Sequence, residues 1–574
     1  MKNSEIAQVF ERIAILLEVK GGEPFKVTAY QRAANSIKTL SIPVEKLVEQ
    51  ERLKEIPGVG DAIAKKVIEL VTTGHLKYYD DLQAQFPAGL FELLTIPGVG
   101  PRTAERLIRE LGIKSANELE EAILDGRIAR LTHFGNKTAE KILHGIRSRQ
   151  TQGQGILLGV ALPAAEEIIA SLGARSPWLE NITITGSVRR GKETVNDIDL
   201  LVVSNSPASV LQAFTELDQV EDIMTRGNNN ASVMTYQGLQ VELQVVPGDI
   251  FGSFLQYCTG SKQHNSLLQA WAQEKELKLS VEGITDIQTG VREKFADEED
   301  LYHRLGLQYI PPELREGQHE VELAHDGKIP RLVEIGDIKG DLHVHTNWSD
   351  GKNSIAEMVQ AAKVLGYGYI AITDHSQGMG LIHGLSEERL RGQIAEIKRI
   401  NQENGGVHVL CGIEVDIRAD GTLSLSDEAL RELDVVIASI HSGMSEDEAQ
   451  ITRRIISAIN NPHVDIIAHP TCRLLGQRDP IKINMEQVLD AARDKGVALE
   501  INAMPNRLDL SDVNTFQAGK ASVKLVIGTD AHDTEHLSMM RYGVSVARRG
   551  WCEAQHIGNT RQNVREYLRK SILV

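Results

Sequence analysis

The sequence predicts a multi-domain chain with an α-helical N-terminal region, an α/β middle region and a C-terminal (β/α)7 barrel. Three observations lead to this fold class. A short Gly-rich unit recurs within the first 150 residues, a pair of aspartates opens an apolar strand in the middle, and seven apolar strands near the end alternate with helical stretches. At 574 residues the chain is long enough for roughly three to five domains.

Composition places the chain among globular proteins. It has 41% hydrophobic and 25% charged residues, which excludes fibrous and disordered classes. Its four cysteines contain no C-x-x-C pair, so we expect neither a disulfide framework nor a cysteine-rich zinc module. No apolar run approaches the ~18 residues of a membrane span, and we expect a cytoplasmic location. The net charge is −17, yet residues 1–150 hold 22 Lys and Arg against 20 Asp and Glu, so this region can still bind nucleic acid.

The repeated unit of the N-terminal region predicts a helix, a hairpin and a second helix. Residues 56–60, Ile-Pro-Gly-Val-Gly, recur unchanged at 96–100, and a weaker third copy begins at Gly135. A Gly-x-Gly hairpin that opens a helix exposes backbone N–H groups at the positive end of that helix, which suits a DNA phosphate of any sequence. The alternative is that these glycines only shape tight turns. The pattern resembles the helix-hairpin-helix motif of DNA repair proteins, which implies DNA binding by Gly58, Gly60, Gly98, Gly100 and Gly135.

The middle region carries residues suited to nucleotidyl transfer. A predicted strand runs into Gly186-Ser187, Arg190 follows, and Asp197 and Asp199 open the next strand. Alternation places both carboxylates on one face of the strand, where they can share a pair of Mg²⁺ ions. The backbone of Gly186 and the hydroxyl of Ser187 can approach a triphosphate, while Arg190 can neutralise the leaving pyrophosphate. Taken alone, an Asp-x-Asp pair is more often a solvated strand edge.

The full string from Gly186 to Asp199 resembles the palm of the nucleotidyltransferase superfamily. Together with the preceding helix-hairpin-helix units it resembles a family X DNA polymerase. The resemblance extends to the thumb segment that contacts the incoming nucleotide in that family, where Tyr257, Gly260 and Asn265 match.

The sequence departs from the family at three positions. The third catalytic carboxylate, normally aspartate, is Glu242, whose extra methylene would displace its oxygens and lower polymerase activity. Cys258 stands where an aromatic residue is usual, and Gln269 lies near a frequent arginine. Lys66 falls at the family's Schiff-base lysine, which implies a catalytic role in removing 5′-deoxyribose phosphate. A cation recurs there in all three repeats, however, so phosphate contact is the alternative.

The strands of the C-terminal region end repeatedly in metal-binding side chains. His-x-His on a strand directs both imidazoles the same way, and imidazoles with carboxylates suit Zn²⁺, Mn²⁺ or Fe²⁺. A single histidine here would more often be a core or capping residue, but six strand ends repeat the pattern. Polar residues gathered at strand C-termini are typical of the active-site face of a β/α barrel. The strands are predicted at 341–345, 370–375, 410–414, 437–441, 466–469, 497–502 and 526–532.

This pattern resembles the polymerase and histidinol phosphatase (PHP) domain, a distorted TIM-like (β/α)7 barrel in which nine residues bind three metal ions. The resemblance implies up to three Mn²⁺ or Zn²⁺ ions and hydrolysis of phosphate esters by an activated water. Arg473 is a candidate phosphate contact, with a surface role as the alternative. All nine ligand positions find a match: His343, His345, Asp350, His375, Glu414, His441, His469, Asp530 and His532.

The whole chain resembles the bacterial form of family X polymerase, which joins polymerase and PHP modules. We therefore expect a monomeric DNA repair enzyme, acting in base excision repair on gapped or primer-template DNA ends. It would fill gaps with dNTPs by a two-metal, Mg²⁺-dependent mechanism and degrade DNA from 3′ to 5′ in the PHP domain. The alternative is a PHP nuclease that binds DNA ends and whose polymerase site is weak or inactive, with Glu242 as the distinguishing feature. A DNA scaffold without catalysis would require the complete ligand set to be vestigial.

The domain boundaries follow composition and motif positions. A polar spacer at 150–155 separates the helical region from the palm, and a charged stretch after Pro311 precedes the barrel. The expected domains are a helix-hairpin-helix DNA-binding domain at 1–85, a helix-hairpin-helix fingers domain at 86–151, the palm at 152–240, the end of the palm and the thumb at 241–315, a linker at 316–336 and the PHP domain at 337–574.

Overall fold

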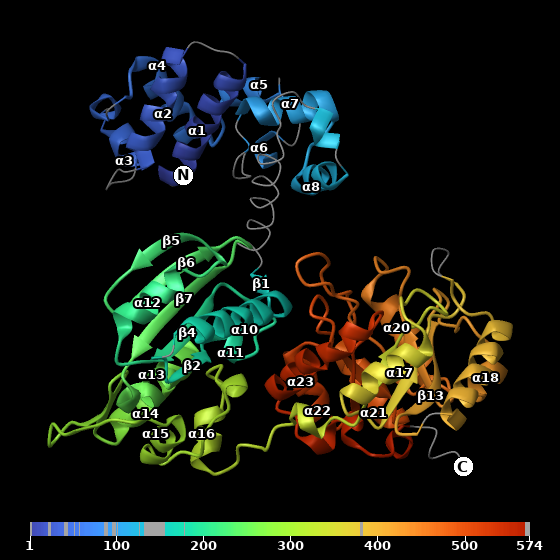
Figure 1. Cartoon of the computed structure of the whole chain (residues 1–574). Helices are drawn as coiled ribbons and strands as arrows, with labels where there is room; N and C mark the ends of the chain where they lie inside the picture. Colours follow the sequence, from blue (N-terminus) through green and yellow to red (C-terminus); the bar gives the residue numbers. More distant parts are fainter. Residues whose placement is uncertain are drawn as a thin grey trace. The chain divides into compact units, whose positions relative to one another are not determined.

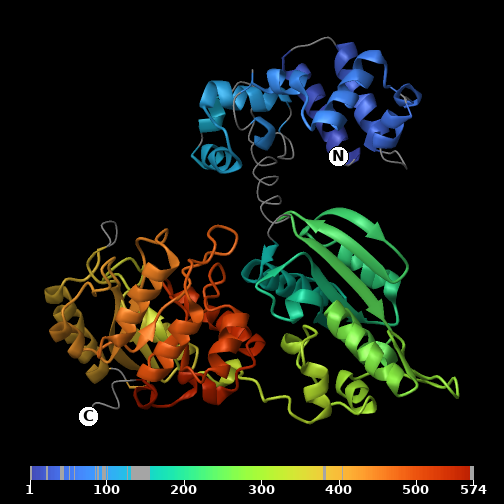
Figure 2. The same ribbon diagram turned by 180° about the vertical axis from the view of Figure 1, so that it is seen from behind.

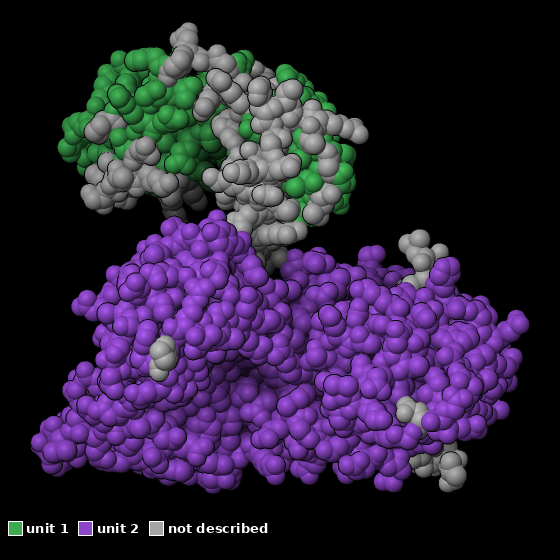
Figure 3. Space-filling model, in the orientation of Figure 1, with its two compact units in different colours: residues 1–153 green, residues 154–574 purple. Residues whose placement is uncertain are grey.

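Residues 1–153 and 154–574 fold as two separate units in the computed structural model (Figure 3). None of the described helices is both long and apolar enough to cross a membrane. The structure describes residues 3–20, 24–38, 44–50, 52–56, 58–84, 86, 90–93, 99, 101–125, 127–130, 155–176, 178–378, 383–403 and 405–568.

The described part of the first unit is helical. On α1 (Asn3–Val19), Ile6, Phe10 and Ile13 recur at helical spacing and are buried in one apolar cluster with the other helices. The hairpin at Gly58 lies between the 3-10 turn η1 (Leu53–Glu55) and α4 (Asp61–Thr73). The remaining elements are α2 (Pro24–Lys38), α3 (Val44–Glu49), α5 (Lys77–Gln83), α6 (Leu90–Leu93), α7 (Pro101–Leu111), α8 (Ala116–Leu124) and η2 (Arg127–Arg130).

The palm of the second unit is built on a five-stranded sheet of order β2-β4-β7-β6-β5 (Figure 1). Its central strands β4 (Ile198–Val203) and β7 (Gln240–Val246) run parallel, and the other pairs are antiparallel. Helices α10 (Leu158–Arg175) and α12 (Pro207–Thr215) pack against these strands. The other elements are β1 (Ile156–Leu157), β2 (Asn181–Ile184), α11 (Gly186–Arg189), β3 (Thr194–Val195), β5 (Val220–Arg226), β6 (Asn230–Thr235) and η3 (Gly248–Ile250).

The thumb follows as two consecutive helices and a small antiparallel sheet of order β10-β9-β8. Leu268 of the second helix is buried with Leu301 and Tyr302 in one apolar cluster. The elements are α13 (Phe251–Thr259), α14 (Lys262–Glu274), β8 (Leu277–Ser280), β9 (Gly283–Asp286), β10 (Arg292–Glu293), α15 (Glu298–Arg304) and η4 (Pro312–Leu314).

Residues 316–336, expected to be a linker, pack into the thumb. They contain α16 (Glu320–His325) and η5 (Ile335–Asp337), and Val321 and Ala324 are buried in the thumb's cluster. Glu320 is itself buried and lies 2.8 Å from the Nδ1 atom of His264 on α14. The apolar residues of this segment are too widely spaced to predict an element, but together they complete the thumb's core.

The last region is a nearly closed barrel of seven parallel strands arranged in chain order, β11 to β17. The first and last strands meet where the His345 amide donates to the Ala531 carbonyl at 2.8 Å. The strands are buried and largely apolar, as in YIAI at 369–372 and VVIAS at 435–439, which is expected for strands buried on both faces. Helices cover their outside (Figures 1 and 2).

The strands of the barrel match the seven predicted from the sequence in order and in type. They are β11 (Gly340–Val344), β12 (Tyr369–Ile372), β13 (His408–Asp416), β14 (Val435–Ser439), β15 (Ile466–Ile467), β16 (Ala498–Asn502) and β17 (Leu525–Gly528). The helices are α17 (Ile355–Val364), α18 (Glu387–Glu403), α19 (Asp427–Arg431), α20 (Glu448–Asn460), α21 (Met485–Lys495), α22 (Asp512–Lys520) and α23 (Met540–Arg549), with 3-10 turns η6 (Thr534–Met539), η7 (Ala554–His556), η8 (Gly558–Thr560) and η9 (Val564–Glu566).

Candidate active sites

The two glycines of the first hairpin differ in what they do for the fold. Gly58 has a φ of +85°, and a Cβ atom there would lie 3.1 Å from the Cβ of Arg32, so the turn itself requires glycine. Gly60 is the N-cap of α4 with a φ of −87°, and a Cβ atom would meet no described atom within 4 Å. The space beside Gly60 at the N-terminus of α4 suits an approaching phosphate.

The corresponding glycines of the other two repeats, Gly98, Gly100 and Gly135, lie outside the described residues.

Lys66 lies on α4, downstream of this hairpin. Its ammonium sits 4.7 Å from the centroid of the Tyr78 ring, and that ring stacks on Tyr30. A cation on an aromatic face is stabilised, which suits a phosphate contact, whereas a Schiff base would form only from the neutral amine. Both roles of Lys66 stay predictions.

The three predicted palm carboxylates lie near the start of the two central strands of the sheet. Asp199 on β4 is the register partner of Glu242 on β7, and Asp197 directly precedes β4. Burial, together with the charges of Asp197 and Glu242, raises the pKa of Asp199 to about 7. Burial also raises the pKa of Asp197, again helped by Glu242. Carboxylates that resist ionisation together form a site that a divalent cation would stabilise.

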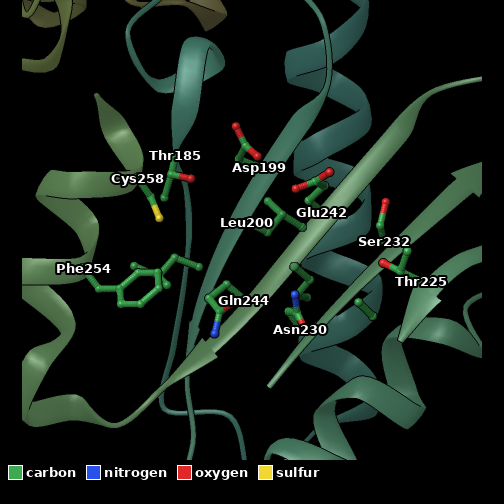
Figure 4. A pocket seen from close by; sticks show the side chains of 13 residues that line it. Thr185, Asp199, Leu200, Thr225, Asn230, Ser232, Glu242, Gln244, Phe254 and Cys258 are labelled. Atoms are coloured by element: carbon green, nitrogen blue, oxygen red, sulfur yellow. The ribbon is translucent and has the colours of Figure 1, made fainter. Parts of the chain in front are cut away.

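Glu242 is the most exposed of the three. Its Oε1 atom accepts a hydrogen bond of 2.9 Å from Gln240, two residues earlier on the same strand. Figure 4 shows Asp199 and Glu242 on neighbouring strands at the margin of a cavity of about 400 Å³, which Cys258 also lines. Among the described residues, the groups whose ligand atoms all lie within 4.8 Å of one another belong to the barrel, so the palm carboxylates are more widely spaced.

Gly186, at the turn that opens α11, lies against the Asp199 carboxylate. It has a φ of +62°, and a Cβ atom there would lie 1.9 Å from the Oδ2 atom of Asp199. The turn also begins with the Thr185 amide donating to the Asp199 carbonyl at 2.8 Å. Only glycine lets this turn, which carries Ser187 at the start of α11, approach the catalytic strand so closely.

Of the predicted nucleotide-binding residues of the thumb, Gly260 lies beside Arg190. The guanidinium of Arg190 donates to the carbonyl of Thr259 and lies 3.3 Å from the carboxylate of Glu316, next to Gly260. Asn265 donates to the carbonyl of Tyr257 at 2.8 Å, and the Tyr257 side chain is 46% exposed. The structure therefore brings the turn and the thumb segment together, with Arg190 held by Glu316 where a triphosphate would compete for it.

The nine predicted ligands of the barrel converge at the carboxyl ends of its strands. His345, Asp350, His375 and His532 form one group of closely spaced donors, and His343 and Asp530 join His345 in a second. The third group is His375 with Glu414 and His441, and the ninth residue, His469, places its Nε2 atom 3.1 Å from the Oε1 atom of Glu414.

The donor set fits several metal ions. Five atoms are buried without a hydrogen-bond partner among the described residues: both ring nitrogens of His345, the Nε2 atom of His343, the Nδ1 atom of His469 and the Oε2 atom of Glu414. Buried polar atoms are otherwise almost always paired, so atoms that converge unpaired on one point are suited to cations.

The protonation states of two of these side chains also suit metal binding. Burial lowers the pKa of His345 to about 3, helped by His532 and His375, so its imidazole is neutral and able to donate a lone pair. Burial opposes ionisation of Glu414, yet His375 and His441 hold its pKa well below the usual range.

A second layer of residues, which the sequence analysis did not assign, orients these ligands. Glu500 lies 2.7 Å from the Nδ1 atom of His343 and accepts from the His469 amide at 2.8 Å. Asp416 holds the Nδ1 atom of His441 at 2.7 Å. Fixing one ring nitrogen leaves the other free for a metal. The signal in the sequence was Glu500 itself, an acidic residue in the sixth strand of the barrel.

Arg473, a candidate phosphate contact, is occupied elsewhere. Its guanidinium is buried and makes two hydrogen bonds of 3.1 and 2.5 Å to the carboxylate of Glu193 in the palm. The cation that does border the ligand cluster is Arg507, whose Nε atom lies 3.5 Å from the Oδ2 atom of Asp530. Local spacing suggested Arg473 because it follows His469 closely, but domain docking turns it toward the palm.

Comparison with known proteins identifies the modules. Family models match a helix-hairpin-helix domain at residues 1–76, a SAM-like helix-hairpin-helix tandem at 90–148, a DNA polymerase beta thumb at 254–316 and a PHP domain at 341–504. The DNA polymerase/3'-5' exonuclease PolX of Bacillus subtilis (strain 168) is 38% identical over 576 residues, covering 100% of both chains. The chain belongs to the bacterial PolX family of family X DNA polymerases.

Two further relatives of this PolX family member each match one part of the chain. DNA polymerase lambda of Rattus norvegicus is 25% identical over 346 residues, which are 55% of this chain and 56% of that protein. A probable phosphatase of Thermoanaerobacter sp. (strain X514) is 32% identical over 244 residues, 40% of this chain and 94% of that protein. The chain thus has one relative that is a DNA polymerase and one that is a probable phosphatase, each matching only part of it.

Proposed function

We propose that this protein is a DNA repair enzyme that combines DNA-directed DNA polymerase activity with 3′–5′ exonuclease activity. The observation that carries the proposal is the presence, in one compact unit, of the palm carboxylates Asp197, Asp199 and Glu242 and of the nine converging donors of the barrel. The likeness to PolX over the whole chain supports both activities.

In the palm, the chain's own residues position the substrate. The turn at Gly186 and Ser187 would bind the triphosphate through its backbone and hydroxyl, and Arg190 would exchange Glu316 for a phosphate oxygen. Asp197, Asp199 and Glu242 would hold the Mg²⁺ ions. Such ions supply the charge that aligns the primer hydroxyl with the triphosphate.

In the barrel, the nine ligands would hold up to three Mn²⁺ or Zn²⁺ ions, which supply an activated water for attack on the phosphodiester. Glu500 and Asp416 orient the imidazoles, and Glu414, placed between His375 and His441, stays ionised. The exposed sides of the cluster are Asp350 and His532, whose side chains are 27% and 29% exposed, so DNA would enter there.

The first unit would bind gapped or primer-template DNA through the N-terminus of α4, and we propose that the protein works as a monomer in base excision repair. Lys66 would act there as a phosphate contact or as the Schiff-base lysine of a lyase step. Borohydride trapping of a 5′-deoxyribose phosphate substrate on the wild type, but not on Lys66→Ala, would establish the lyase step.

The two activities are tested with single-nucleotide gapped DNA and dNTPs. With His343→Ala disabling the barrel, we expect gap filling that a further Asp199→Ala change abolishes. In the wild type without dNTPs, we expect 3′-end degradation that His343→Ala abolishes. If the His343→Ala protein and its Asp199→Ala derivative are equally inactive in gap filling while both bind DNA, the palm is silent and the protein is a PHP nuclease that binds DNA ends.

A further inference from the structure

The loop between β16 and α22 borders both the palm and the ligand cluster of the barrel. It leaves β16 at Asn502, whose side chain donates to the Oδ2 atom of Asp530 at 3.1 Å. Five residues later, Arg507 places its Nε atom 3.5 Å from the same oxygen. Loops that follow barrel strands carry the substrate-binding groups of such folds, and the Arg507 side chain is 21% exposed.

Arg473 fixes the backbone of this loop. Its Nε atom donates to the carbonyl of Arg507 at 2.9 Å, and its NH2 group donates to the carbonyl of Leu508. The amides of Arg507 and Leu508 both donate to the carbonyl of Met504, at 2.8 and 3.0 Å. The planar guanidinium fork of Arg473 therefore determines where the Arg507 side chain begins.

The palm in turn holds Arg473. The two remaining hydrogen bonds of its guanidinium go to Glu193, which lies three residues after Arg190 in the palm turn. A second contact secures the same loop, because a Cβ atom at Gly159 of α10 would lie 2.2 Å from Pro505. The loop is thus enclosed between the palm and the ligand cluster, and a displacement of the palm would release it.

We propose that Arg507 binds the substrate phosphate in the nuclease site and that the palm, through Glu193 and Arg473, holds Arg507 in place. The polymerase domain is then a structural part of the exonuclease. The inference rests on the proposed function of the barrel. An arginine beside the metal ligands can pair with a phosphodiester oxygen as DNA enters, and it can exchange Asp530 for that oxygen because its head group is partly exposed.

The first experiment measures 3′–5′ degradation by the full chain carrying Arg507→Gln, Arg507→Lys or Arg507→Ala. We expect a 10- to 100-fold rise in KM for Arg507→Gln, roughly the loss of one charged hydrogen bond, and a smaller rise for Arg507→Lys. Guanidinium added in solution should partly restore Arg507→Ala. Mn²⁺ affinity, measured by calorimetry, should stay unchanged. Arg565→Gln, at an exposed arginine paired with Asp434, is the matched control.

The second experiment tests the contribution of the palm with Glu193→Gln and Arg473→Lys. We expect exonuclease kcat/KM to fall about tenfold or more, because a misplacement near 1 Å costs up to about 100-fold. Gap filling should be unchanged for Glu193→Gln. Amide hydrogen exchange at Arg507 and Leu508 should accelerate in both variants. Glu180→Gln is the control, since Glu180 accepts its hydrogen bond from Asn205 within the palm.

These outcomes distinguish a failure of the proposed nuclease function from a failure of the roles proposed for Arg507 and the palm. If the wild type degrades no DNA and hydrogen exchange still responds to Glu193→Gln, the nuclease function fails while the docking of the loop stands. If the wild type is an exonuclease but the Arg507 variants keep its KM and change only Mn²⁺ affinity, Arg507 acts only through the metal ligand Asp530 and the inference is overturned. Unchanged exonuclease activity and exchange in Glu193→Gln and Arg473→Lys would remove the role of the palm.

Discussion

Replacing Gly186 by alanine should disable the polymerase, because the added Cβ atom would clash with the Asp199 carboxylate. The new Cβ would lie 1.9 Å from the Oδ2 atom of Asp199, whereas ordinary contacts begin at 3.4 Å. The carboxylate or the turn must therefore move by roughly 1.5 Å, and at least ~10²-fold in rate should be lost when a ligand of the reacting groups moves that far. The φ of +62° adds a backbone cost of about 1 kcal/mol for alanine.

The assay is single-turnover gap filling with saturating dNTP, on a background where His343→Ala removes degradation. Gly173→Ala is the matched control, because Gly173 lies in α10 of the same domain and a Cβ there meets no described atom within 4 Å. That control should leave gap filling unchanged and should slightly raise the melting temperature, since alanine favours helix over glycine by about 1 kcal/mol.

If Gly186→Ala fills gaps at a rate within a few-fold of the wild type, the prediction is wrong. The turn would then accommodate a Cβ atom that the structure shows to clash with Asp199. A variant that loses activity only together with its folded state would not support the argument either, so its melting temperature and DNA binding are measured alongside. The expected result is a folded protein that binds DNA normally and incorporates poorly.

Four further predictions test the remaining parts of the molecule. Glu242→Asp should raise gap filling, most clearly with Mg²⁺, whose octahedral demand tolerates misplaced oxygens poorly; equal or lower incorporation than the wild type would show that the longer side chain is not the limit. His343→Ala should abolish 3′-end degradation and leave DNA binding intact, and an undiminished rate would remove the nuclease from the barrel. Gly60→Ala should fold normally, because its Cβ meets no described atom within 4 Å, and should weaken binding to all DNA sequences alike in titrations by fluorescence anisotropy; a sequence-selective loss would contradict a backbone contact. Burial opposes ionisation of Glu298, yet buried arginine partners lower its pKa to about 2; because the unfolded chain binds this proton near 4.5, stability should fall by about 3 kcal/mol as the pH drops between these values, and Glu298→Gln should flatten that part of the urea-unfolding profile.

The sequence by itself predicted the seven-stranded barrel, its nine candidate ligands and the candidate carboxylates of the palm. Each of these signals is local: a strand places alternate residues on one face, and the carboxyl ends of parallel strands meet at one edge. His343 and His345 therefore predict a shared site before any strand order is known, and Asp197 and Asp199 do the same in the palm. The turn at Gly186 is also local, because its glycine and the catalytic strand lie within a short stretch of chain.

Only the tertiary structure shows which residues that are far apart in the sequence come into contact. Arg473 and Glu193 are 280 residues apart, and no periodicity links them. Their pairing depends on how two folded surfaces dock, since an ion pair is buried wherever the domains exclude water around it. The same holds for Glu500 beside His343, 157 residues away, and for the segment 316–336, whose scattered apolar residues form a core only against the thumb. Local chemistry specified the two active sites, and the packing of domains specified which charges connect them.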